Sequence, residues 1–73
     1  MKIRYDTEAD AMYIEIHPLE PGTAECRELS DEIVADYGPD GKLAGIEILD
    51  ASQVFSSEEL KQIIVEVSPA RAA

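Results

Sequence analysis

Cysteine, tryptophan and basic residues are scarce in this chain of 73 residues, and each shortage excludes a class of protein. Cys26 is the only cysteine, so no disulfide can form within the chain to support its small core. The aromatic residues are three tyrosines and one phenylalanine, with no basic residues interleaved, which argues against a platform for stacking single-stranded nucleic acid. Six Lys and Arg against sixteen Asp and Glu give a net charge of −10, so phosphate-rich surfaces such as a DNA duplex or an anionic membrane would be repelled.

Long hydrophobic runs are also missing. The first residues, MKIRYD, contain neither the apolar stretch nor the small-residue cleavage site of a signal peptide. No stretch approaches the ~20 apolar residues of a membrane-spanning helix. Together with the unpaired cysteine, these absences lead us to expect a cytoplasmic protein.

What the sequence does contain is alternation of apolar and polar residues, which is typical of half-buried strands. KIRYD and AMYIEI alternate clearly, TAECREL does so weakly, and two further alternating runs flank the turn sequence GPDG. The apolar phase shifts near Gly45, which indicates a bulge or a close approach of the backbone. We therefore predict an α+β fold, a small antiparallel β-meander of four to five strands with one C-terminal helix. One domain is expected over residues 1–68, followed by a flexible tail over 69–73.

The predicted helix rests on signals near its start. Ser56 and Glu59 have the spacing of a capping box, and Phe55 with Leu60 that of a hydrophobic staple. Apolar residues at helical spacing would then cover one face of the sheet, leaving the other open or paired in a dimer. We expect this helix to begin near Ser57 and to fray before residue 67. The β-branched run IIV opposes it, so the sequence leaves open whether residues 62–68 are helix or strand.

The densest acidic stretch is the predicted turn that holds Asp6, Glu8 and Asp10. It has three interpretations. The first is a hairpin turn in which an aspartate bonds its own backbone, the second an acidic binding edge, and the third a site for a hard cation such as Ca²⁺ or Mg²⁺. The first is favoured, since the stretch has fewer ligands than a calcium loop and no glycine.

A second set of candidate residues lies on the strands. On a meander, Tyr13, Asp36 and Glu47 could share one sheet face, with Asp50 at the end of a strand. Either these residues form a solvated polar face, or a carboxylate among them acts as a general base.

The two blocks KIRYDTEADAMYIEI and DEIVADYGPDGKLAGIEILDAS resemble the YuzE-like family of small bacterial and archaeal domains of unknown function. The matching positions are Tyr5, Asp6, Ala9, Asp10, Ala11 and Tyr13, then Asp40, Gly41, Gly45, Ile46, Glu47, Ile48, Leu49, Asp50 and Ala51. The resemblance implies a small α+β domain without an established activity. It also implies a link to small toxins, because some members are encoded beside them and have been suggested to act as antitoxins.

The function expected from these observations is a non-enzymatic protein-interaction module without a cofactor or a bound metal. Its partner would be a second copy, with a dimer favoured, or a small basic protein that an antitoxin-like chain neutralises. The candidate binding edge comprises Asp6, Glu8, Asp10, Tyr13, Asp36, Glu47 and Asp50. The alternatives are a domain that binds a divalent cation or small ligand through the acidic turn, and a small enzyme with a strand carboxylate as general base.

Overall fold

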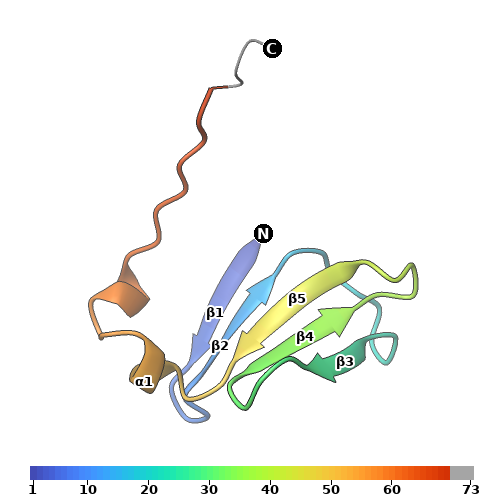
Figure 1. The fold of residues 1–73 in the computed structure, drawn as a ribbon, viewed down its shortest axis with the longest axis horizontal. Coiled ribbons are helices and arrows are strands. Elements are labelled where there is room, and N and C mark those ends of the chain that lie inside the picture. Colours follow the sequence, from blue (N-terminus) through green and yellow to red (C-terminus); the bar gives the residue numbers. More distant parts are fainter. Residues whose placement is uncertain (70–73) are drawn as a thin grey trace.

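The computed structural model describes residues 1–69 and has the predicted α+β class (Figure 1). Its sheet is antiparallel throughout. The strands are β1 (Lys2–Asp6), β2 (Ala11–Glu15), β3 (Glu25–Glu28), β4 (Ile33–Tyr37) and β5 (Leu43–Ile48). Two short helical turns follow, α1 (Ala51–Val54) and the 3₁₀ turn η1 (Glu59–Lys61). No helix in residues 1–69 is long and apolar enough to cross a membrane.

The strand order is β1-β2-β5-β4-β3, so the sheet departs from a simple meander at one point. β1 and β2 form a hairpin, and β3, β4 and β5 follow one another as neighbours. β2 pairs with β5 rather than with β3, which makes residues 16–24 a long connection to the far edge of the sheet. β2 and β5 are therefore the strands that join the two halves.

The turn between β1 and β2 is the self-bonding hairpin turn that the sequence predicts. Asp6 Oδ1 accepts hydrogen bonds from the backbone N–H groups of Glu8 at 2.9 Å and Ala9 at 3.2 Å. Asp10 closes the turn with φ of 50°, a left-handed conformation that aspartate tolerates better than most residues. The first interpretation of this acidic stretch is thus confirmed as a description of its geometry.

The phase shift near Gly45 has two structural causes. Gly45 pairs with Asp36 while Leu43 pairs with Tyr37, so Ala44 between them is an extra residue in β5. Its carbonyl accepts hydrogen bonds from two successive N–H groups that follow β2. The backbone of Gly45 is also closely approached, because a Cβ at this position would overlap the Tyr13 phenol. The sequence prediction offered a bulge or a close approach, and both are present.

The prediction of a helix from Ser57 was wrong. The capping box does form, since Ser56 N–H donates to Glu59 Oε1 at 2.8 Å and Glu59 N–H donates to Ser56 Oγ at 3.1 Å. It leads, however, into the single turn η1, and residues 62–69 have no regular secondary structure. A β-branched run is a poor helix former, and helices of this length depend on tertiary packing that these exposed residues do not have. Of the predicted tail over 69–73, residues 70–73 lie outside the described part of the chain.

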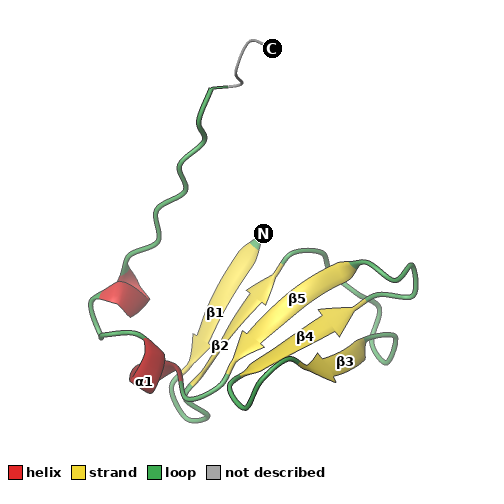
Figure 2. Cartoon of the chain, viewed as in Figure 1, coloured by secondary structure: helices red, strands yellow, loops and turns green. Residues whose placement is uncertain are grey.

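Because that helix does not form, nothing from residues 1–69 covers the sheet as a second layer (Figure 2). Helix α1 lies at the end of the sheet, beside β1 and β2, rather than over either face. The buried apolar residues of the described chain are Met12, Ala35, Ala44 and Ala51, and no large side chain there is fully buried. The sheet is consequently a single layer whose apolar side chains remain partly in contact with water.

Candidate functional site

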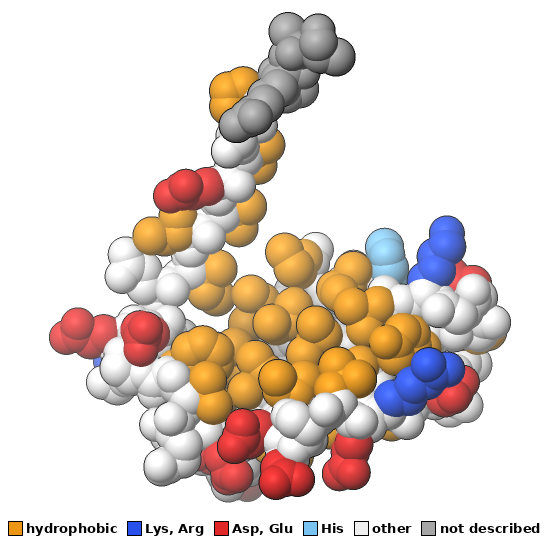
Figure 3. All heavy atoms as spheres, in the orientation of Figure 1, with side chains coloured by type: hydrophobic (Ala, Val, Ile, Leu, Met, Phe, Trp, Pro, Cys, Tyr) orange, Lys and Arg blue, Asp and Glu red, His pale blue; other side chains and the backbone are white. Residues whose placement is uncertain are grey.

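One face of the sheet is apolar across four neighbouring strands, β1, β2, β5 and β4. The cross-strand register aligns two rows of side chains across it. The first row is Tyr5, Met12, Ile48 and Ile33, and the second is Ile3, Ile14, Ile46 and Ala35. Figure 3 shows these rows as a continuous hydrophobic surface in the middle of the molecule. We call this set of eight residues the apolar face.

The apolar face is only half buried. Met12 and Ala35 are its buried members, whereas Ile33 keeps 37% of its surface exposed and the others are intermediate. A contiguous exposed apolar patch of this kind marks an interaction site in most soluble proteins. Full burial of a fully exposed isoleucine side chain is worth about 1.5–3 kcal/mol, so covering these partly buried side chains would gain the fraction of that energy that matches their remaining exposure. The sequence prediction had one face covered by the helix, and the observed face is open.

An acidic end adjoins the apolar face. The antiparallel order brings the β1–β2 turn, the β3–β4 turn and the residues after β5 to the same end of the sheet. These segments carry six carboxylates, namely Asp6, Glu8, Asp10, Asp31, Glu32 and Asp50, which we call the acidic end. Figure 3 shows acidic side chains along this edge of the hydrophobic surface.

Four of these six carboxylates were predicted from the sequence as candidate site residues, and Asp31 and Glu32 were not. No local signal could have included them, because they lie more than twenty positions beyond the acidic turn and join it only through the β2–β5 pairing. Asp50 was a candidate in the set with Tyr13, Asp36 and Glu47, and it stands beside the acidic turn: the next residue, Ala51, donates its N–H to the Asp10 carbonyl at 2.9 Å.

Asp10 has a structural task within the acidic end. Its Oδ1 accepts hydrogen bonds from the Tyr5 hydroxyl at 2.6 Å and the Ser52 N–H at 3.0 Å, and its Oδ2 accepts from Ser52 Oγ. The hydrogen bonds from Ser52 and then from Tyr5 lower the pKa of Asp10, while the same carboxylate raises the pKa of Tyr5. Through these hydrogen bonds, Asp10 links α1 to the β1–β2 hairpin.

The acidic turn does not gather its carboxylates around one point. Asp6 is engaged by two backbone N–H groups and Asp10 by Tyr5 and Ser52. In residues 1–69, no group of three or more His, Cys, Asp and Glu side chains is placed to hold a metal ion. The geometry therefore gives the cation interpretation no support.

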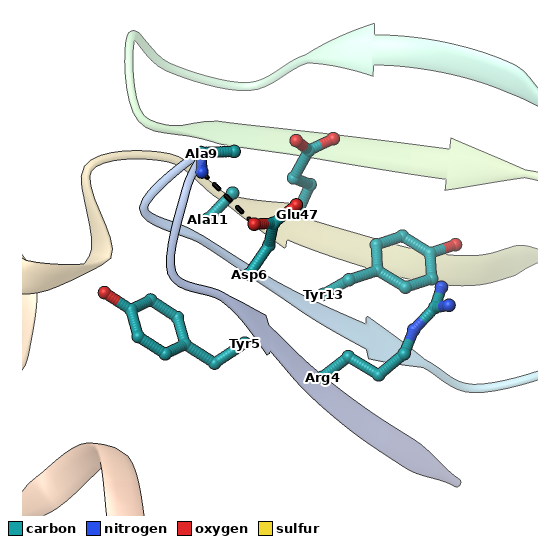
Figure 4. Close-up of a pocket in the computed structure, with 7 residues that line it drawn as sticks. All are labelled: Arg4, Tyr5, Asp6, Ala9, Ala11, Tyr13 and Glu47. Atoms are coloured by element: carbon teal, nitrogen blue, oxygen red, sulfur yellow. Dashed lines mark hydrogen bonds between the residues drawn. The ribbon is translucent and has the colours of Figure 1, made fainter.

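The opposite face of the sheet is polar, and it carries Tyr13, Asp36 and Glu47 together as the sequence analysis proposed. Tyr13 donates a hydrogen bond to Asp36 Oδ2 at 3.0 Å, and the Arg4 guanidinium lies 5.7 Å from the centre of the Tyr13 ring. Figure 4 shows Arg4 beside Tyr13, with Glu47 on the neighbouring strand, around a shallow hollow. Burial, and then the Asp36 carboxylate, raise the pKa of Tyr13.

The side chains of this polar cluster interact with one another. Asp36 receives the Tyr13 hydroxyl, and it also raises the pKa of the exposed Cys26 thiol through a hydrogen bond and its charge. A raised thiol pKa makes Cys26 a weaker nucleophile at neutral pH. The arrangement stabilises the polar face, and it presents neither an activated nucleophile nor a free base within a deep cleft.

A family model described as "Protein of unknown function (DUF2283)" matches residues 2–52. The match spans all five strands and the beginning of α1, which includes both rows of the apolar face and the whole acidic end. Neither a curated protein nor a solved structure matches the chain. The chain belongs to the DUF2283 family.

Proposed function

We propose that this DUF2283 protein is a non-enzymatic interaction module that binds a small basic protein through its apolar face and acidic end. The observation that carries this proposal is the open apolar face, which crosses four strands and which no second layer from residues 1–69 covers. A chain of this size buries little surface on its own, so a partner that covers the face would supply the missing half of a core.

Charge supports a basic partner over other occupants of this face. The six carboxylates of the acidic end border the apolar face, and the chain as a whole has a net charge of −10. A partner with an apolar surface flanked by Lys and Arg would be steered toward this end and would match it on docking. Face-to-face packing of two identical copies would instead join two chains that each carry a net charge of −10.

The resemblance to the YuzE-like family suggests which kind of basic protein the partner is, namely a small toxin. If the chain acts as the antitoxin-like partner of a small basic toxin, it neutralises by covering the toxin, since its own charge is unsuited to binding an operator. We place this activity in the cytoplasm, as the sequence analysis expects.

The two alternatives lack a comparable observation. A cation site would need carboxylates that converge, and those of the turn are held apart by their own hydrogen bonds. A general base would need a concave site around it, whereas Asp36 is bonded to Tyr13 and Glu47 lines only the shallow hollow of Figure 4.

The test is co-expression with the product of the neighbouring gene, followed by co-purification and light scattering, and the proposal requires that this product be small and basic. Two neighbouring residues of β4 give a matched pair of variants. Ile33 lies on the apolar face and Val34 on the polar face, so Ile33→Glu should abolish the complex while Val34→Glu should retain it. Circular dichroism of each variant reports whether the sheet is intact.

If the Ile33→Glu chain is folded and still forms the complex, the proposal that the partner binds through the apolar face is wrong. If no complex forms with the native chain, the proposal of a basic neighbour as the partner fails.

A further inference from the structure

We infer that the extended segment Gln62–Val67 of one copy pairs with the β1 edge of a second copy, as an added antiparallel strand. This inference goes beyond the proposed function, because it uses the backbone edge of β1 and, of the apolar face, only the edge residues Ile3 and Tyr5. It rests on the sequence pattern of the segment, on the chemistry of the two sheet edges and on the course of the chain after η1.

The segment has the composition of a strand but no strand partner in residues 1–69. Its sequence is QIIVEV, and Gln62 has extended backbone angles, φ −122° and ψ 113°. The side chains of Ile63, Ile64, Val65 and Val67 are 57%, 69%, 71% and 87% exposed. Consecutive β-branched residues left in water are an unfavourable arrangement that pairing with a sheet edge would relieve.

The two edges of the sheet differ in what they offer. β3 carries Glu25 and Arg27 on the side that continues the apolar face, and such charges protect an edge from pairing. β1 carries Ile3 and Tyr5 on that side instead, and its outer backbone groups face no other strand of the described chain. The β1 edge is therefore the receptive one.

The alternation of the segment fits β1 at every position except Ile64. When Ile63, Val65 and Val67 continue the apolar face beyond Ile3 and Tyr5, Gln62, Ile64 and Glu66 fall on the polar face. An antiparallel strand can keep this phase in two central registers, and these place Glu66 opposite either Lys2 or Arg4. Opposite charges at directly facing positions of a sheet are stabilising, so the charges select the same face that the apolar residues do.

The course of the chain favours a second copy over the chain's own β1. Lys61, at the end of η1, borders a hollow that it shares with Tyr5 and Thr7, close to the end of β1. From there the segment runs away from the sheet instead of turning back along β1 (Figure 1). Two copies can exchange such segments reciprocally, and each exchange occupies one edge, so the pair closes as a two-fold dimer.

Light scattering on the full chain, without any partner, tests the inference. We expect a mass of twice the 8.0 kDa of one chain. Val65→Pro should return the mass to that of a monomer, because proline removes a ladder donor from the middle of the added strand. Val65→Thr keeps a β-branched residue and is the matched control, which should remain dimeric.

Charge-reversal variants distinguish pairing between two copies from pairing of the segment with β1 of its own chain. Glu66→Lys alone places a third base beside Lys2 and Arg4. Lys2→Glu with Arg4→Glu places two new acids beside Glu66, so each variant alone should be monomeric. An equimolar mixture of the two should recover the dimer mass, since both exchanged interfaces then join opposite charges.

A native chain that is monomeric throughout the concentration range would overturn the inference. A dimer of unchanged mass with Val65→Pro, or a mixture that stays monomeric, would overturn it as well. These outcomes are distinguishable from those for the basic protein. Ile33→Glu tests that complex and lies on β4, whereas the segment pairs with β1, at the edge of the sheet beyond β2.

Discussion

The Tyr13 phenol and the Asp36 carboxylate, 23 residues apart in the chain, meet across β5 at 3.0 Å because Gly45 between them has no side chain. The ring lies over the glycine backbone, and the hydroxyl thereby reaches the strand beyond. This relationship ties β2 to β4 through β5, at the junction between the two halves of the sheet. It also explains why a glycine stands in the interior of a strand.

Substitution of Gly45 by alanine should destabilise the chain by about 1–3 kcal/mol, since the new Cβ overlaps the ring and displaces it. Tyr13→Phe, which loses only the hydrogen bond, should cost about 1 kcal/mol. Urea unfolding measures both. In a Tyr13→Ala background, Gly45→Ala should cost much less, because the ring that it would displace is gone. Equal costs in the two backgrounds would contradict this account.

Stability should fall in acid through Asp10. Its pKa is lowered in the folded chain from its ordinary 3.8, so the unfolded chain takes up the proton more readily. The stabilisation is fully present above the unfolded pKa and is lost as pH falls through the lower folded value, a window below about pH 4. Urea unfolding of the native chain and of Asp10→Asn should therefore show a steeper acid decline for the native chain. Parallel pH profiles would mean that the Ser52 and Tyr5 contacts do not hold the carboxylate ionised.

The Cys26 thiol should react slowly despite its exposure. Asp36 raises its pKa above the ordinary 9.0, which lowers the thiolate fraction at neutral pH. Iodoacetamide at pH 7 should alkylate Asp36→Asn faster than the native chain. Asp31→Asn removes a carboxylate that lies in the β3–β4 turn and should leave the rate unchanged, which separates the local contact from the loss of net charge.

The acidic end should set the rate of association with a basic partner. Asp31→Lys should slow association by roughly two- to tenfold at low salt, and added salt should narrow the difference. Glu20→Lys changes the net charge equally within the connection at the opposite end of the sheet, so it should have a smaller effect. Stopped-flow binding at several salt concentrations makes the comparison. Equal effects of the two variants would show that only net charge matters.

Divalent cations should leave the melting temperature unchanged. Asp6 and Asp10 are engaged by separate hydrogen-bond donors and do not converge. Millimolar Ca²⁺ or Mg²⁺ should therefore shift thermal unfolding no more than NaCl of equal ionic strength. A saturating rise in melting temperature would indicate specific binding to the native state and would restore the cation-binding alternative.

Local sequence patterns predicted the local features well. The alternation of KIRYD and AMYIEI, the turn bonding of Asp6 and the capping box of Ser56 and Glu59 all depend on neighbours a few residues away. The helix prediction failed at the same capping box, because a helix start is a local feature whereas its continuation requires a surface on which to pack. The run IIV found none among the described residues and remained exposed.

The alternation of the strands, the positions of the turns and the strongly acidic charge follow from residue identity and short-range geometry alone. The pairing of β2 with β5, in contrast, arises only when the whole sheet assembles. That pairing gathers Asp31, Glu32 and Asp50 beside the acidic turn and aligns the apolar rows into one open face. Strand order depends on contacts between residues far apart in the chain, which period-two alternation cannot specify because it fits any neighbour equally well.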